Sequence, residues 1–229
     1  MQTLLGLGTV ILGYILGSIP FGLLIVKIKT GKDIRQVESG RTGGTNAVRA
    51  AGFGAGLLTA ILDILKGAAS VWLAEILLPD ADLFHVLAPI GAILGHNYSL
   101  FLISREEDGK LRFHGGAGGA PALGGAMGLW PWMFPIVFGA GAIIWFGVGI
   151  ASLTTMAIGL VVIIVFAIRV SLGLQEPIDI WYGILAEILL LWALRPNIRK
   201  LLSGQERVVK FSLNGWLRAR KEAQAESQK

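Results

Sequence analysis

The chain has 229 residues, of which 54% are hydrophobic and only 15% are charged, and its mean hydropathy is +0.67. These totals exclude an ordinary soluble domain and indicate one polytopic membrane domain, for which 32 glycines and 7 tryptophans are also typical. The absence of cysteine excludes disulfides, and the three histidines are too widely spaced for a metal-binding motif. The net charge of +5 fits contact with lipid headgroups and gives no reason to expect nucleic-acid binding.

Seven apolar segments are candidates for transmembrane helices, each of which needs about 20 apolar residues. We expect these helices at 3–26, 54–78, 83–103, 119–137, 138–151, 153–170 and 178–194. Six helices is the alternative count, because 119–170 is one apolar run that we divide into three. The predicted fold class is all-α, a polytopic membrane protein with about seven transmembrane helices.

The basic residues predict the orientation of these helices. Of the 20 lysines and arginines, all but Lys66 and Arg169 follow the first helix, the third helix or the last helix. Because basic loops stay in the cytoplasm, the N-terminus is expected outside and the C-terminus in the cytoplasm. The first residues carry no cation and no small-residue cleavage site follows, so we expect the first helix to be retained.

The chain divides into a membrane domain, 1–204, and a basic cytoplasmic tail, 205–229. Apolar residues such as Trp216 and Leu217 recur among the basic ones of the tail. The tail could lie along the inner leaflet as an amphipathic segment or be plainly solvated. Residues 221–229 have the composition of a disordered end.

A loop rich in glycine and hydroxyl groups, Glu38–Arg49, connects the first two helices. Its glycines allow tight turns that present backbone N–H groups to a ligand, and its polar side chains add further hydrogen-bonding groups. Arg41 and Arg49 add guanidinium forks that suit phosphate. The loop predicts an anion-binding site, and the alternative is a basic loop whose glycines only make turns.

A second glycine-rich segment, Phe113–Gly124, opens the fourth helix. The start of a helix carries free N–H groups and the positive end of the helix dipole, so this segment is a second candidate anion site. The alternative is a re-entrant turn or a closely packed helix start.

Three of the ionisable residues inside the predicted helices are candidates for a role at the site. Asp63 and Lys66 are three apart on one helix face, and His96 ends the third helix. Charges at membrane depth are costly and usually face each other or a cavity, so the pair is either a neutralised structural pair or support for a site. His96 is a candidate base or hydrogen-bond partner of a substrate hydroxyl, or a packed core histidine.

By the charge pattern, these groups and the basic end of the last helix, 195–204, share the cytoplasmic face. Two glycine loops, arginines, a histidine and an asparagine gathered there favour phosphate chemistry at the inner leaflet.

The order of these motifs resembles the bacterial membrane acyl-phosphate:glycerol-3-phosphate acyltransferases of the PlsY type, over nearly the whole chain. The matching residues are Gly17-Ser18-Ile19-Pro20-Phe21-Gly22, Ser39-Gly40, Gly43, Thr45-Asn46, Arg49, Asp63, Lys66-Gly67, Gly95-His96, Gly115-Gly116, Gly118, Ser152-Leu153, Asn197-Ile198, Leu201-Leu202, Gly204 and Glu206.

The resemblance implies acyl transfer from acyl phosphate to the 1-hydroxyl of glycerol 3-phosphate, which gives lysophosphatidic acid at the cytoplasmic face of the inner membrane. It implies no metal, no cofactor and no covalent acyl-enzyme, with membrane lipids as surroundings. It places Ser39 and His96 at the reacting groups. The expected substrate-binding residues are Gly40, Arg41, Gly43, Thr45, Asn46, Arg49, Gly115, Gly116, Gly118 and Asn197.

The chain departs from the family pattern at Ala117, where the family has lysine, and at Leu194, where it has histidine. The third place of the Ser-Gly-Asn motif is Arg41, and Pro121 follows the second glycine loop. Our hypothesis is that Arg41 restores the missing cation. The alternatives are a catalytically degenerate member that serves as a subunit or scaffold of a membrane complex, and a transporter or lipid-binding protein.

Overall fold

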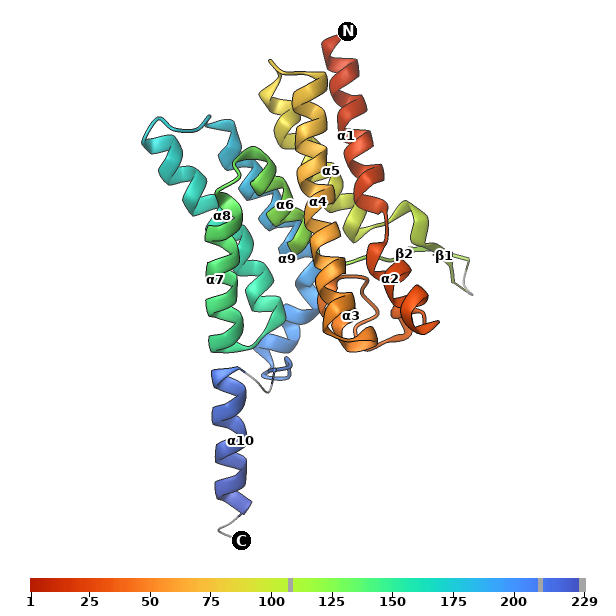
Figure 1. Cartoon of the computed structure of the whole chain (residues 1–229), viewed down its shortest axis with the longest axis vertical. Helices are drawn as coiled ribbons and strands as arrows, with labels where there is room; N and C mark the ends of the chain where they lie inside the picture. Colours follow the sequence, from red (N-terminus) through yellow and green to blue (C-terminus); the bar gives the residue numbers. More distant parts are fainter. Residues whose placement is uncertain (107–108, 210–211, 227–229) are drawn as a thin grey trace.

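A computed structural model of the chain describes residues 1–106, 109–209 and 212–226, and it is mostly helical (Figure 1). The helices are α1 (Gln2–Ser18), α2 (Phe21–Thr30), α3 (Gly44–Ala51), α4 (Phe53–Leu77), α5 (Asp82–Asn97), α6 (Gly119–Leu129), α7 (Met133–Val148), α8 (Ala151–Ser171), α9 (Ile178–Leu202) and α10 (Leu213–Glu226). Short 3₁₀ turns cover Ile34–Gln36 and Leu100–Leu102. An antiparallel hairpin joins β1 (Ile103–Arg105) to β2 (Leu111–Phe113).

Three helical segments of the described residues are long and apolar enough to cross a membrane, namely Gln2–Thr30, Phe53–Leu77 and Ala151–Ser171. Helix α7 is also apolar but shorter. Large apolar side chains are exposed along the helices, including those of Ile11, Ile61, Ile143 and Ile164. Such side chains suit helices that face hydrocarbon, so the prediction of a helical membrane protein is confirmed in this coarse form.

Two of the predicted helices are interrupted at prolines. The helix expected at 3–26 is broken between Ser18 and Phe21, because Pro20 has no N–H for a helical hydrogen bond. The helix expected at 119–137 ends at Leu129, and the next one begins at Met133, since Pro131 lies between them. The long apolar run is therefore divided earlier than the sequence pattern indicated.

Two further boundaries differ from the prediction. The helix expected at 83–103 ends at Asn97, and the strictly helical prediction misses the hairpin that follows, where Ile103 pairs with Phe113. At the other end of the membrane domain, α9 continues to Leu202, well beyond the predicted end at 194.

The predicted tail contains a helix, α10. It extends to Glu226, so the disorder that we expected from Lys221 onward is wrong as far as that residue. The side-chain amide of Asn214 donates a hydrogen bond of 3.1 Å to the carbonyl of Val148, which attaches α10 to the end of α7. Residues 210, 211 and 227–229 of the predicted tail lie outside the described residues.

Helix α6 lies in the interior of the bundle, packed against α4, α5, α8 and α9. Its glycines allow this close packing, since a Cβ added at Gly124 would stand 1.9 Å from the carbonyl oxygen of Ile64 on α4. The hydroxyl of Tyr182 donates a hydrogen bond of 2.6 Å to the carbonyl of Ala122, which connects α6 to α9. The start of α6, where the second glycine loop ends, is therefore held firmly in place.

The segments that carry most of the basic residues meet at one end of the molecule (Figure 1). The N-terminus and the α8–α9 connection lie at the opposite end from α2, α3, the hairpin and the last turns of α9. This shared end holds both glycine loops.

Candidate functional site

A cavity of about 560 Å³ opens where the two glycine loops meet α9. Four separate stretches of chain line it, between residues 35 and 196 of the sequence. The lining residues are Arg35, Glu38, Ser39, Gly40, Arg41, Asn97, Tyr98, Arg112, Phe113, His114, Gly115, Gly116, Trp192, Ala193, Arg195 and Pro196. Of the predicted site residues, Ser39, Gly40, Arg41, Gly115 and Gly116 are among them.

Backbone hydrogen bonds join the second glycine loop to the first and to the end of α5. The N–H of Thr42 donates to the carbonyl of Gly115 at 3.2 Å, and the N–H of Gly116 donates to the carbonyl of His96 at 2.8 Å. A Cβ at Gly115 would stand 2.2 Å from that same His96 carbonyl oxygen, so no larger residue allows this approach. The convergence of the loops therefore depends on glycine at this position.

The side chain of Asn46 hydrogen-bonds to the backbone of the first glycine loop and of the turn before it. The two N–H groups of its side-chain amide are shared among the carbonyls of Ile34, Val37 and Arg41, which lie 3.2, 2.9 and 2.9 Å from Nδ2. Because the amide nitrogen is used in these bonds and the residue is buried, the structure places Asn46 beneath the loop and outside the cavity lining.

The backbone of the first glycine loop also turns sharply at the cavity. Gly40 has φ +67° and Glu38 has φ +50°, a region that favours glycine. A non-glycine residue held in that region is a strained position of the kind found at functional sites. The side chain of Glu38 forms an exposed ion pair with Arg207.

Arginines give the cavity its positive charge. Arg35 is paired with Asp33 at 2.6 Å and Arg112 with Glu106 at 2.7 Å, so these two are partly neutralised. Arg41 instead donates a hydrogen bond of 2.8 Å to the carbonyl of Ala193 and forms no ion pair among the described residues. Burial lowers the pKa of Arg41, and the charge of Glu206 opposes that change; an arginine remains protonated at neutral pH all the same.

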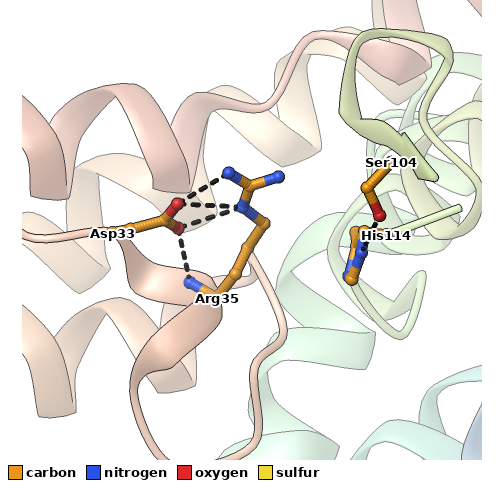
Figure 2. Close-up of polar contacts among 4 residues, drawn as sticks. All are labelled: Asp33, Arg35, Ser104 and His114. Carbon is orange, nitrogen blue, oxygen red and sulfur yellow. Dashed lines mark hydrogen bonds and ion pairs between the residues drawn. The ribbon is translucent and has the colours of Figure 1, made fainter. Parts of the chain in front are cut away.

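Figure 2 shows two polar pairs at the edge of the cavity. Arg35 contacts both carboxylate oxygens of Asp33, and the Nε2 atom of His114 lies 2.9 Å from the hydroxyl of Ser104. Burial lowers the pKa of His114, and the positive charges of Arg112 and Arg35 lower it further. The imidazole of His114 is therefore neutral at neutral pH.

His96 lies behind the cavity, in contact with the ionisable pair of α4. Its Nδ1 atom is 2.9 Å from Nζ of Lys66, which in turn is 2.8 Å from Oδ1 of Asp63. All three side chains are buried. The other ring nitrogen, Nε2, faces Gly116, since a Cβ added there would stand 1.9 Å from it.

Asn97 is a residue that the sequence reasoning did not select. It lines the cavity, it is 6% exposed, and neither Nδ2 nor Oδ1 has a hydrogen-bond partner in the part of the chain that the structure describes. A buried amide without partners costs about 1–3 kcal/mol, so it is rarely kept for packing alone. Its position directly after His96 at a helix end is the only sequence signal that could have pointed to it.

Other predicted site residues do not line this cavity. Gly43 and Thr45 lie at the start of α3, Arg49 is exposed on that helix, and Gly118 packs against Asn97. Asn197 donates a hydrogen bond of 2.9 Å to Glu206, which also accepts one from Ser152 at 3.0 Å.

The two positions that depart from the family pattern, Ala117 and Leu194, also lie outside the cavity lining. Within the described ranges, no group of three or more His, Cys, Asp or Glu residues is placed to hold a metal ion.

Comparison with known proteins identifies a family. The model of the family described as glycerol-3-phosphate acyltransferase matches residues 7–204. A glycerol-3-phosphate acyltransferase of Anaeromyxobacter sp. (strain Fw109-5) is 35% identical over 212 residues, which cover 90% of this chain and 97% of the relative. The glycerol-3-phosphate acyltransferase of Rubrobacter xylanophilus is 37% identical over 198 residues, which cover 86% of this chain and 92% of the relative.

Two crystal structures of PlsY (YgiH), an integral membrane glycerol 3-phosphate acyltransferase, have the same fold. The glycerol 3-phosphate form matches with a TM-score of 0.75 and 31% identity, over 89% of this chain and 95% of that one. The lysophosphatidic acid form matches with a TM-score of 0.74 and 29% identity, over 90% and 96%.

Proposed function

This chain belongs to the glycerol-3-phosphate acyltransferase family, and we propose that it transfers a fatty acyl group to the 1-hydroxyl of glycerol 3-phosphate, with acyl phosphate as the donor. The product is lysophosphatidic acid, the first acylated intermediate on the way to phospholipids. The relatives' names and the two ligand forms of the similar crystal structures support the acceptor and the product. The donor rests on the resemblance of the motifs.

The observation that carries the proposal is the cavity in which two glycine loops and α9 meet around several arginines. Both substrates are anions, and an acyl phosphate is already an activated anhydride. The protein therefore has mainly to hold two phosphates and to orient one hydroxyl toward the acyl carbon, which positioned donors and cations achieve. No metal ion or covalent intermediate is required for this reaction.

Arg41 takes the place of the family lysine in this proposal. It is half-buried at the cavity, forms no ion pair within the described chain, and its guanidinium reaches across to α9. Because only one of its contacts is to a backbone carbonyl, the guanidinium keeps donors free for a bidentate contact with phosphate. Ser39 and the backbone of Gly40, Gly115 and Gly116 line the same cavity as further hydrogen-bonding groups.

We further propose that the chain crosses the inner membrane of a bacterium seven times, with the cavity at the cytoplasmic face. The shared position of the basic segments at one end supports this orientation (Figure 1). Helix α6 has 11 residues and a length of about 16 Å, which is too short to cross alone. It is enclosed by longer helices, where a short segment is tolerated.

The orientation has a direct test, because the chain has no native cysteine. Single cysteines at Gln2, Gln175 and Gln205 report on the two ends of the bundle through labelling of intact cells with an impermeant maleimide. We expect labelling of the first two in intact cells and of the third only after permeabilisation. The reverse pattern would show that the cavity faces outward.

The activity is tested with the purified chain in lipid nanodiscs, a long-chain acyl phosphate and glycerol 3-phosphate. We expect phosphate release that requires glycerol 3-phosphate and equals the lysophosphatidic acid formed. The same assay with acyl-CoA in place of acyl phosphate should give no product. Release of phosphate without formation of lysophosphatidic acid would overturn the proposal.

A further inference from the structure

Behind the cavity, one buried ammonium group has three acceptors. Nζ of Lys66 lies 2.8 Å from Oδ1 of Asp63, 2.9 Å from Nδ1 of His96 and 3.1 Å from the carbonyl oxygen of Ile19. The Ile19 carbonyl lies at the break between α1 and α2, where Pro20 interrupts the helix, and it also accepts a hydrogen bond from the N–H of Phe21. A protonated lysine has three N–H donors, so this arrangement satisfies each of them once.

These contacts assign the proton of His96. A lysine ammonium can only donate, so a nitrogen 2.9 Å from it must accept with its lone pair. The alternative, a proton on Nδ1 that is donated to Asp63, is disfavoured because Oδ1 of Asp63 is 3.5 Å away. The proton of the neutral imidazole therefore lies on Nε2.

The geometry also shows where this Nε2–H group points. A Cβ added at Gly116 would stand 1.9 Å from Nε2, so the ring nitrogen occupies the space that a side chain would fill. Gly116 lines the cavity, and its own N–H is bonded to the carbonyl of His96. The N–H group of the imidazole is thus directed at the Gly116 edge of the cavity.

We propose that Lys66, held in place by Asp63, is a positioning residue that fixes His96 in its Nε2–H tautomer. In this tautomer His96 donates a hydrogen bond to an oxygen of the phosphorylated substrate and does not act as a general base. The role of His96 toward substrate rests on the proposed function, whereas the tautomer does not. A base would need its lone pair on Nε2, which this network assigns to Nδ1. Asp63 keeps the buried ammonium neutralised, since a lone charge at this depth is costly.

The tautomer is tested by ¹⁵N NMR of the full chain in nanodiscs with ¹⁵N-labelled histidine. The His96 signals are those that disappear in His96→Gln. We expect a protonated Nε2 and an unprotonated Nδ1 in the wild-type chain. A protonated Nδ1, or protons on both nitrogens, would overturn the proposal whether or not the chain transfers acyl groups.

The role of Lys66 is tested with the double variant Asp63→Asn/Lys66→Met. It removes both charges together, so it leaves no unpaired charge in the interior and is less prone to unfold than Lys66→Met alone. We expect the His96 signals to shift toward a mixture of tautomers. Lys29→Met, an exposed lysine on α2, is the matched control and should leave them unchanged. Unchanged signals in the double variant would show that Lys66 does not set the tautomer.

Activity separates a donor from a base. Glutamine at position 96 places an amide N–H near the position of Nε2, whereas asparagine reaches only the position of Nδ1, and neither is basic. If His96 is a donor, His96→Gln should keep turnover within about 10-fold of wild type, while His96→Asn should lose about 10- to 150-fold. Equal losses in both variants would identify a base and overturn the donor role. A wild-type chain without turnover would instead defeat the proposed function and leave the NMR result standing.

Discussion

The guanidinium of Arg41 donates a hydrogen bond of 2.8 Å to the carbonyl oxygen of Ala193, although the two residues are 152 positions apart. This contact connects the first glycine loop to α9 next to Leu194, where the resemblance would have placed a histidine. One arginine side chain thus reaches the part of α9 next to Leu194, one of the two positions at which the chain lacks a basic residue of the family pattern.

Arg41→Asn restores the asparagine of the family motif and should lower kcat/KM by about 10- to 150-fold, the range expected when a hydrogen bond to a charged group is lost. Arg112→Ala should cost less, because Arg112 is exposed and already paired with Glu106. Steady-state kinetics with glycerol 3-phosphate measures both. Arg105→Gln, on an exposed residue outside the cavity lining, is the control. Similar small effects at positions 41 and 112 would contradict the role of Arg41.

The variant Asn97→Leu, which keeps the branched shape and the number of side-chain heavy atoms, should raise the thermal stability of the ligand-free chain and lower its turnover. The physical reason is that it removes a buried amide without partners, which costs about 1–3 kcal/mol in the folded state. Asn46→Leu is the matched comparison and should lower stability, because its amide makes three hydrogen bonds. The measurements are the melting temperature and the turnover of both variants. A lower melting temperature in Asn97→Leu would show that the Asn97 amide stabilises the fold and is not kept for substrate.

Gly116→Ala should abolish most of the activity, since the added Cβ would stand 1.9 Å from Nε2 of His96 and one of the two groups must move. Gly54→Ala on α4 adds the same methyl group where nothing lies within 4 Å and serves as the control. Turnover and the histidine NMR signals are the measurements. Normal activity in Gly116→Ala would mean that the imidazole does not need its observed position.

The pKa of His114 predicts a pH dependence of stability. Burial lowers this pKa in the folded chain, with Arg112 and Arg35 acting in the same direction, so protonation favours the unfolded chain. The stabilising effect of the neutral ring is complete above the ordinary histidine pKa of about 6.5 and is lost as the pH falls through the lower folded value. His114→Gln should therefore unfold with a weaker pH dependence between about pH 7 and pH 5. Parallel melting curves of wild type and variant over this range would contradict the prediction.

The amino-acid sequence by itself determined the class of the protein and the end at which its chemistry gathers. Hydropathy and the placement of basic residues are summed over many positions, so they predict a helical membrane protein whose glycine loops share one end. Local chemistry also explains the errors at Pro20 and Pro131, where the missing N–H ends a helix that hydropathy alone would continue. The hairpin after Asn97 had no such local signal.

Only the tertiary structure decided which hydrogen-bond partners each polar side chain has. Asn46 and Asn97 are the same residue type beside glycine-rich loops, yet the amide nitrogen of Asn46 is bonded to carbonyls of the first loop and neither polar atom of the Asn97 amide has a partner among the described residues. Lys66 and His96 meet across 30 positions because α4 and α5 pack together, and their 2.9 Å contact assigns the imidazole proton. Partners of this kind depend on how helices pack, and packing distances are not encoded in the spacing of residues along one chain segment.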